Sequence, residues 1–191
     1  MSECVKVLRD ELPYNLHIFV NSVEFIAKVI DTLKLAPEAV KIVCSTSGDS
    51  RQENQRKLGN AYPIGQPSDP AKKINFYTST CFEGCDIFDP DGVTFIVSDG
   101  RKAHTLLDIS TLFTQICGRI RDSRYKTQIV HVYSTTKYSK AVTLDEFVAA
   151  TQRTLADAEK FASDINAVDE PSREKLLKKI SYINEQYVRI A

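Results

Sequence analysis

Two arginines with one residue between them, Arg119 and Arg121, are the side chains of this sequence best suited to chemistry. Gln115 stands four residues before Arg119, and Gly118 stands directly before it. Residues four apart share one face of a helix, so the amide of Gln115 and the guanidinium of Arg119 are expected to point the same way. Guanidinium groups hold phosphate oxygens in a planar, bidentate geometry. The spacing therefore indicates a grip on the phosphates of a nucleotide bound elsewhere; cations that complement a helix dipole are the alternative.

A cluster of polar residues follows the apolar run Ile74–Tyr77, which predicts a buried strand. These residues combine hydroxyl groups with a glycine and a carboxylate: Thr78, Ser79, Thr80, Gly84 and Asp86. Open parallel sheets bind ligands at the carboxyl ends of their strands. The cluster therefore predicts a binding edge, and turn formation or helix capping is the alternative role.

Asn21 and Ser22 follow another apolar run, Leu16–Val20, which also predicts a strand. Asn21 stands three residues before Glu24, the spacing of a capping box. The free N–H groups of a helix N-terminus attract anions, so a phosphate contact is expected here. Capping without any ligand is the alternative.

Ser45 and Ser47 lie in a Ser/Thr/Gly segment directly after the apolar run Val40–Cys44. Hydroxyl groups and backbone donors in such a segment can surround a phosphate. The same composition is also common in segments that only turn the chain.

Two of these segments carry a family resemblance. Residues 77–86, Y-T-S-T-C-F-E-G-C-D, resemble motif V of superfamily 2 helicases, and residues 115–121, Q-I-C-G-R-I-R, resemble their motif VI, Q-x-x-G-R-x-x-R. The resemblance is to the second RecA-like domain only. Asp122 stands where many members hold the second arginine. Members of the duplex-RNA sensor branch place that arginine two after the first, so Arg121 is taken as the second arginine and Arg124 as the alternative.

The resemblance implies a role for each candidate residue. Arg119 and Arg121 would be catalytic arginine fingers that reach ATP and Mg²⁺ held by a P-loop domain. Nucleotide-binding roles would fall to Gln115, Gly118, Gly84 and Asp86. Contacts to a nucleic-acid backbone would come from Asn21, Ser22, Ser45, Ser47, Thr78, Ser79 and Thr80.

The chain contains no G-x-x-x-x-G-K-[ST] segment, the sequence of a phosphate-binding P-loop. We therefore expect no ATP hydrolysis by this chain alone, and expect a P-loop domain of the same or a neighbouring chain as partner. The second expected partner is a nucleic-acid strand, with DNA favoured over RNA. A catalytically inactive RecA-like module that binds nucleic acid or another protein is the alternative function.

The spacing of apolar runs predicts an α/β fold, and the resemblance implies a RecA-like three-layer αβα arrangement with a central, mainly parallel sheet. Further strands are predicted at 93–97 and 127–133, and a helix is predicted from Asp108 or Ser110 through Ile120. No structure is predicted for 1–14. We expect the α/β domain to span 1–140 and a helical extension to span 141–191. Apolar residues of the extension recur every three or four positions on both sides of 168–171, which predicts an antiparallel hairpin.

The composition bounds the class of protein. Lys plus Arg and Asp plus Glu number 25 each, so any basic binding surface must be local. The five cysteines form no C-x-x-C pair, which predicts reduced core thiols rather than a metal site. No apolar run is long enough to cross a bilayer, so we expect a cytoplasmic protein without membrane contact.

Overall fold

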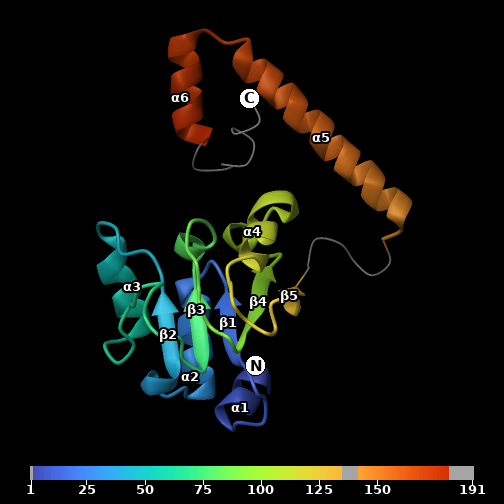
Figure 1. Ribbon diagram of the computed structural model, residues 1–191. Helices are drawn as coiled ribbons and strands as arrows, with labels where there is room; N and C mark the ends of the chain where they lie inside the picture. The colour runs from blue at the N-terminus through green and yellow to red at the C-terminus, as the bar shows by residue number, and fades with distance from the viewer. Residues whose placement is uncertain (1, 135–141, 181–191) are drawn as a thin grey trace. The chain divides into compact units, whose positions relative to one another are not determined.

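A computed structural model of the chain describes residues 2–134 and 142–180 (Figure 1). The chain divides into two compact units, Met1–Lys137 and Tyr138–Ala191. The predicted boundary between residues 140 and 141 lies among residues that the structure does not describe.

The first unit is built on a five-stranded sheet in the order β2-β3-β1-β4-β5. All neighbouring strands are parallel, so the α/β class is confirmed, and the sheet is wholly rather than mainly parallel. Figure 1 shows the labelled strands side by side, with the central β1 between β3 and β4. The bounds are β1 (Asn15–Phe19), β2 (Val40–Val43), β3 (Ile74–Tyr77), β4 (Gly92–Asp99) and β5 (Ile129–Ser134).

Both faces of the sheet are covered by apolar side chains, as expected for parallel strands. Side chains alternate between the faces, so Leu16 and Ile18 of β1 join one cluster and Phe19 joins the other. The first cluster includes side chains of α1 (Ser2–Leu8), α2 (Val23–Leu33) and α3 (Ser50–Leu58). The second is formed with the connection that follows β3 and with Ile116 and Ile120.

The entry into α2 differs in part from the prediction. Ser22 is the N-cap, and its hydroxyl accepts a hydrogen bond from Phe25 N at 3.2 Å. The predicted capping box between Asn21 and Glu24 is wrong, because the cap lies one residue later and Glu24 instead pairs with Lys102. Helix α1 was not predicted, since a short segment of mixed polarity carries no periodic signal.

The helix predicted to run through Ile120 is shorter than expected. Asp108 begins it, as one of the two predicted starts, with its carboxylate accepting from Thr111 N at 2.9 Å. A π-helical turn, η4 (Ile109–Phe113), leads into α4 (Thr114–Cys117). The chain leaves the helix at Gly118, because Ile120 forms a parallel β-bridge with Ile87. The prediction that Gln115 and Arg119 share a helical face is therefore wrong.

The second unit contains α5 (Leu144–Asn166) and α6 (Glu170–Ile180). A capping box begins α5: Thr143 Oγ1 accepts from Glu146 N, and the Glu146 carboxylate in turn accepts from Thr143 N. The hairpin stays a prediction, since its seam residues Ile183, Tyr187 and Ile190 lie outside the described residues. None of the helices in the described ranges has the length and apolar character needed to cross a membrane.

Replacement of the α2 cap tests how this helix begins. Ser22→Ala removes the acceptor of Phe25 N and should lower the free energy of unfolding by about 1 kcal/mol. Ser22→Thr keeps the oxygen and should retain most of that stability. Urea unfolding of the three proteins measures the difference, and equal losses in both variants would contradict the cap assignment.

Candidate nucleotide and nucleic-acid interface

The ends of β1 and β3 are joined by Asn21. Its Oδ1 accepts from Ser79 N at 3.4 Å, and its Nδ2 donates to His104 O at 2.8 Å. Backbone hydrogen bonding continues the link, because Val20 N donates to Tyr77 O at 2.9 Å. The structure thus brings together residues predicted from separate segments to contact one strand of nucleic acid.

The hydroxyl groups at this edge differ in exposure. Thr78 is buried, and its Oγ1 lies 3.1 Å from that of Thr80, whereas Ser79 and Thr80 are exposed. Ser22 is also buried and is engaged in its cap. After β2, the hydroxyl oxygens of Ser45 and Ser47 lie 2.9 Å apart. Thr78 N bonds to Val43 O at 3.0 Å, so the ends of β2 and β3 are adjacent.

The two predicted nucleotide-binding segments are in direct contact. Residues 87 and 120 form the β-bridge, with Ile87 N donating to Arg119 O at 2.9 Å and Arg121 N donating to Ile87 O at 3.0 Å. Arg119 reaches back across this contact. Its Nε donates to Gln115 O at 2.9 Å and its Nη1 donates to Cys85 O at 3.1 Å. The guanidinium is therefore fixed against both segments.

The other two arginines hold carboxylates at different places. Arg121 Nε lies 2.6 Å from Asp86 Oδ1, and both side chains are about half exposed, at 48% and 49%. Arg124 Nη2 lies 2.5 Å from Asp91 Oδ1, directly before β4 begins. Arg124 is thus at the amino end of a strand, whereas Arg121 adjoins Asp86 of the other predicted segment. This geometry favours Arg121 over Arg124 as the partner of Arg119.

The backbone conformation accounts for glycine at position 84 but not at position 118. Gly84 has φ +72°, a conformation that side-chain-bearing residues rarely adopt, and no atom lies within 4 Å of the place that a Cβ would take. Gly118 has φ −95°, and the nearest atom to an added Cβ is Gln115 O at 3.6 Å. Neither backbone strain nor crowding within the described chain requires glycine at 118.

A buried polar network that the sequence analysis missed lies behind this surface. His17 is fully buried; its Nε2 lies 2.8 Å from Asp89 Oδ2 and its Nδ1 lies 3.1 Å from the Tyr77 hydroxyl. Asp89 also accepts from Asn15 Nδ2 at 3.0 Å and from Asp91 N at 3.0 Å. Burial opposes ionisation of Asp89, but these hydrogen bonds outweigh it and hold the pKa of its carboxyl below the usual value. The only local signal that the sequence offers is Asp-Pro-Asp-Gly at 89–92, and these residues form a turn in which Gly92 N donates to Asp89 O at 3.1 Å.

Two of the buried cysteines, Cys81 and Cys44, are thiols of the core. Cys81 is fully buried, and burial together with Cys85 raises the pKa of its thiol to about 12. Burial raises the pKa of Cys44 to about 11. Neither thiol ionises near neutral pH, so neither is a nucleophile there. No cluster of three or more potential metal ligands occurs among the residues that the structure describes.

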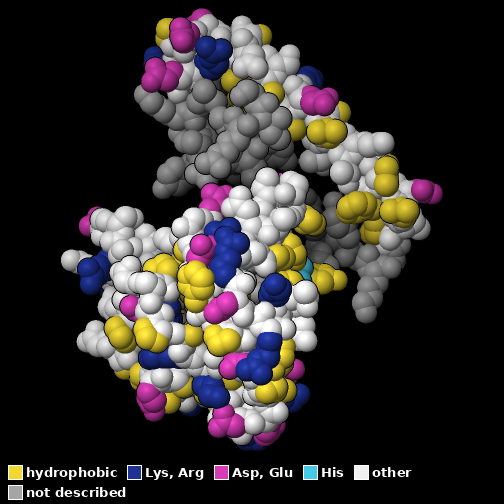
Figure 2. All heavy atoms as spheres, in the orientation of Figure 1, with side chains coloured by type: hydrophobic (Ala, Val, Ile, Leu, Met, Phe, Trp, Pro, Cys, Tyr) yellow, Lys and Arg dark blue, Asp and Glu magenta, His cyan; other side chains and the backbone are white. Residues whose placement is uncertain are grey.

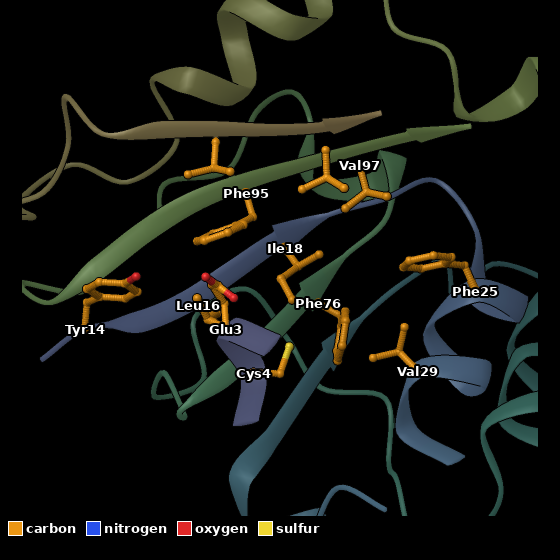
Figure 3. A pocket seen from close by; sticks show the side chains of 12 residues that line it. Glu3, Cys4, Tyr14, Leu16, Ile18, Phe25, Val29, Phe76, Phe95 and Val97 are labelled. Carbon is orange, nitrogen blue, oxygen red and sulfur yellow. The ribbon is translucent and has the colours of Figure 1, made fainter. Parts of the chain in front are cut away.

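A groove lies elsewhere, on the face of the sheet that α1 and α2 flank (Figure 3). Its volume is about 520 Å³, and Figure 3 shows rings of Tyr14, Phe25, Phe76 and Phe95 around it. None of the predicted site residues lines it. Its lining is mostly apolar, so it offers hydrophobic contact rather than groups that could carry out catalysis.

Charges of both signs lie side by side on the visible face of the first unit (Figure 2). Arg121–Asp86 and Arg101–Asp99 are two ion pairs of the first unit. The hydrogen bonds from Arg101, and a further one from Ser134, lower the pKa of the Asp99 carboxyl. This face is therefore of mixed charge rather than uniformly positive.

No protein-family model, no curated protein and no solved structure matches this chain.

The ionisation of Asp89 predicts a pH-dependent contribution to stability. Because its pKa is lowered in the folded state, the ionised carboxylate stabilises the fold above the unfolded value of about 4, and this contribution is lost as the pH falls through the folded pKa. Asp89→Asn should lower the free energy of unfolding by about 1.5–3 kcal/mol near pH 7. The difference from the unmodified protein should narrow below about pH 4.

Urea unfolding at a series of pH values measures this difference. Asp91→Asn is the matched control, because Asp91 is more exposed and its pair with Arg124 should contribute at most about 1 kcal/mol. A loss for Asp89→Asn that stays constant from pH 7 to pH 3 would contradict the assigned ionisation.

Proposed function

We propose that the first unit is the second RecA-like motor domain of an ATP-dependent nucleic-acid helicase or translocase of superfamily 2. A P-loop domain that this sequence does not contain would hold ATP and Mg²⁺. Arg119 and Arg121 would reach the γ-phosphate and stabilise the charge that develops in the transition state. Asn21, Ser79 and Thr80 would contact the backbone of one strand, and closure and opening of the two domains would move them along it.

The contact between residues 84–87 and 115–121 is the observation that supports this proposal most strongly. The resemblance to motifs V and VI rests on two segments separated in sequence, and their function requires them to be adjacent. The bridge between Ile87 and Ile120 and the bond from Arg119 to Cys85 O make them so. A chance likeness of two short segments carries no such requirement.

The arginines remain able to meet a phosphate. The bonds of Arg119 use Nε and Nη1, and no residue of the described ranges bonds to its Nη2. The Arg121–Asp86 pair is half exposed, so it contributes only about 0.2–1 kcal/mol. A phosphate can therefore replace Asp86 at small cost. The unstrained, exposed Gly118 beside Arg119 leaves room for a ligand to approach the backbone.

A catalytically inactive module that binds nucleic acid or another protein is the second candidate. The absence of a P-loop sequence from these 191 residues favours it. An inactive module does not require Arg119 or Gly118 for nucleotide turnover. The two candidate functions therefore differ in whether replacing these residues changes the rate of ATP hydrolysis.

The finger assignment predicts a large kinetic defect. With the P-loop domain present, Arg119→Ala should lower kcat for ATP hydrolysis on the order of 10³-fold, because the transition-state charge loses its stabilising cation. Nucleotide affinity should change little. Steady-state ATPase kinetics and nucleotide titration measure the two effects.

Arg124→Ala is the matched control, since it removes an exposed arginine three residues beyond Arg121. It should leave kcat close to that of the unmodified protein. Normal turnover in Arg119→Ala would remove the motor proposal and leave the inactive module.

Binding to a single strand is the second test of the proposal. The affinity of the chain for single-stranded DNA should fall as salt rises and should be similar for unrelated sequences, because the contacts are to phosphates. Replacing Ser79 and Thr80 together by Ala should weaken binding by roughly tenfold for every sequence. Ser110→Ala, an exposed hydroxyl bonded to Asp108, is the control. Affinity that varies with sequence but not with salt would contradict the proposed contact.

A further inference from the structure

Asp122 occupies the position where the second arginine of the motif usually stands, and its side chain has a defined partner. Its Oδ1 accepts a hydrogen bond from Asp89 N at 2.8 Å. The acceptor is therefore fixed to the backbone of the residue whose own carboxylate holds the buried His17. The departure from the motif is thus associated with a specific structural contact.

This contact is one of several that tie residues 119–124 to residues 87–92. Arg119 O and Arg121 N bond to the backbone of Ile87, and Arg124 N donates to Pro90 O at 3.0 Å. Ser123 is buried, and its hydroxyl donates to Gly92 O at 2.6 Å. The two segments thus run side by side as a ladder of hydrogen bonds, and the Asp122 side chain supplies one of the contacts between them.

The segment 87–92 is itself anchored in the sheet. Asp89 Oδ2 is held by His17 of β1, and His17 is held by the hydroxyl of Tyr77 of β3. His17 and Tyr77 are both fully buried. A continuous series of hydrogen bonds therefore runs from β1 and β3 through Asp89 and Asp122 to the arginine segment.

We propose that Asp122, together with the buried pair His17–Asp89, is a positioning element that sets where Arg119 and Arg121 lie. The proposal rests on the motor function proposed above. Asp122 touches no nucleotide in this role. It holds residues 119–122, which carry the two arginines, against Asp89 and so against the sheet. Arg119 and Arg121 lie beyond the end of α4, so no helix fixes their backbone. The hydrogen bonds to residues 87–92 fix it instead.

Amide hydrogen exchange of the 191-residue chain tests the positioning directly. Asp122→Ala removes this contact with Asp89 N but leaves the core intact, since Asp122 is exposed. Exchange should speed up at least about tenfold at Ile87 and Arg121 as well as at Asp89. Asp122→Asn keeps an oxygen acceptor and should restore slow exchange. Asp91→Ala, which removes a partly exposed carboxylate of the same region, should leave all three amides unchanged.

Faster exchange confined to Asp89 in Asp122→Ala would overturn the inference, because it would show a local contact without effect on the arginine segment. This measurement needs neither ATP nor a partner domain. Its result is therefore independent of whether the motor proposal holds.

Kinetics with the P-loop domain then separate the two proposals. Asp122→Ala should lower kcat by roughly 10- to 100-fold with KM for ATP unchanged, as small displacements of catalytic groups do, and Asp122→Asn should recover most of it. If Arg119→Ala abolishes turnover while Asp122→Ala retains the full kcat, the positioning role is wrong and the motor stands. If Arg119→Ala has no effect, the motor proposal fails.

Discussion

The connection from β3 to β4 imposes the constraint on which the rest of this surface depends. Parallel strands are usually joined by a helix, which satisfies its own backbone hydrogen bonds. Here the connection contains only the short 3₁₀ turn η2 (Ser79–Cys81) before it crosses the face of the sheet. Its remaining buried backbone groups must find partners elsewhere in the fold. Residues 119–124 provide them, so the segment that carries the arginines is also the segment that completes this connection.

This arrangement joins the candidate site to the centre of the sheet. A conventional crossover helix would separate the arginines from β1 and β3, whereas the extended connection brings Asp89 within reach of His17. A buried ionisable pair is costly unless its remaining hydrogen-bonding groups are satisfied. Asn15 and the backbone of Asp91 satisfy the carboxylate, and Tyr77 satisfies the second ring nitrogen of His17. The network is complete, and it therefore specifies one position for the connection.

The parts that could be predicted were those encoded by local patterns. The apolar runs at 16–20, 40–44 and 74–77 are buried on both faces, so their composition alone identified the strands to within a residue or two. The helix through Ile120 was predicted too long because its apolar spacing fits a helix, while the bridge with Ile87 is a tertiary contact that competes with it. His17 and Asp89 are separated by 72 residues, and no local pattern links them. Asp122 and Asp89 are likewise far apart in sequence. The sequence therefore indicates only that Asp122 departs from the motif, and not that it accepts a hydrogen bond from Asp89 N.

The half-exposed Arg121–Asp86 pair is suited to the exchange of partners that the proposed function requires. A free arginine on a segment without helical support would lose side-chain order, and a buried pair would be too costly to separate. A half-exposed pair avoids both outcomes, since it contributes about 0.2–1 kcal/mol. Exchange of Asp86 for a phosphate oxygen would therefore cost no more than this amount, and the new charge-assisted bond would offset it. Under the proposed function, the carboxylate would keep the Arg121 guanidinium near the place where a phosphate binds, and Arg119, held by Gln115 O and Cys85 O, would supply the second cation.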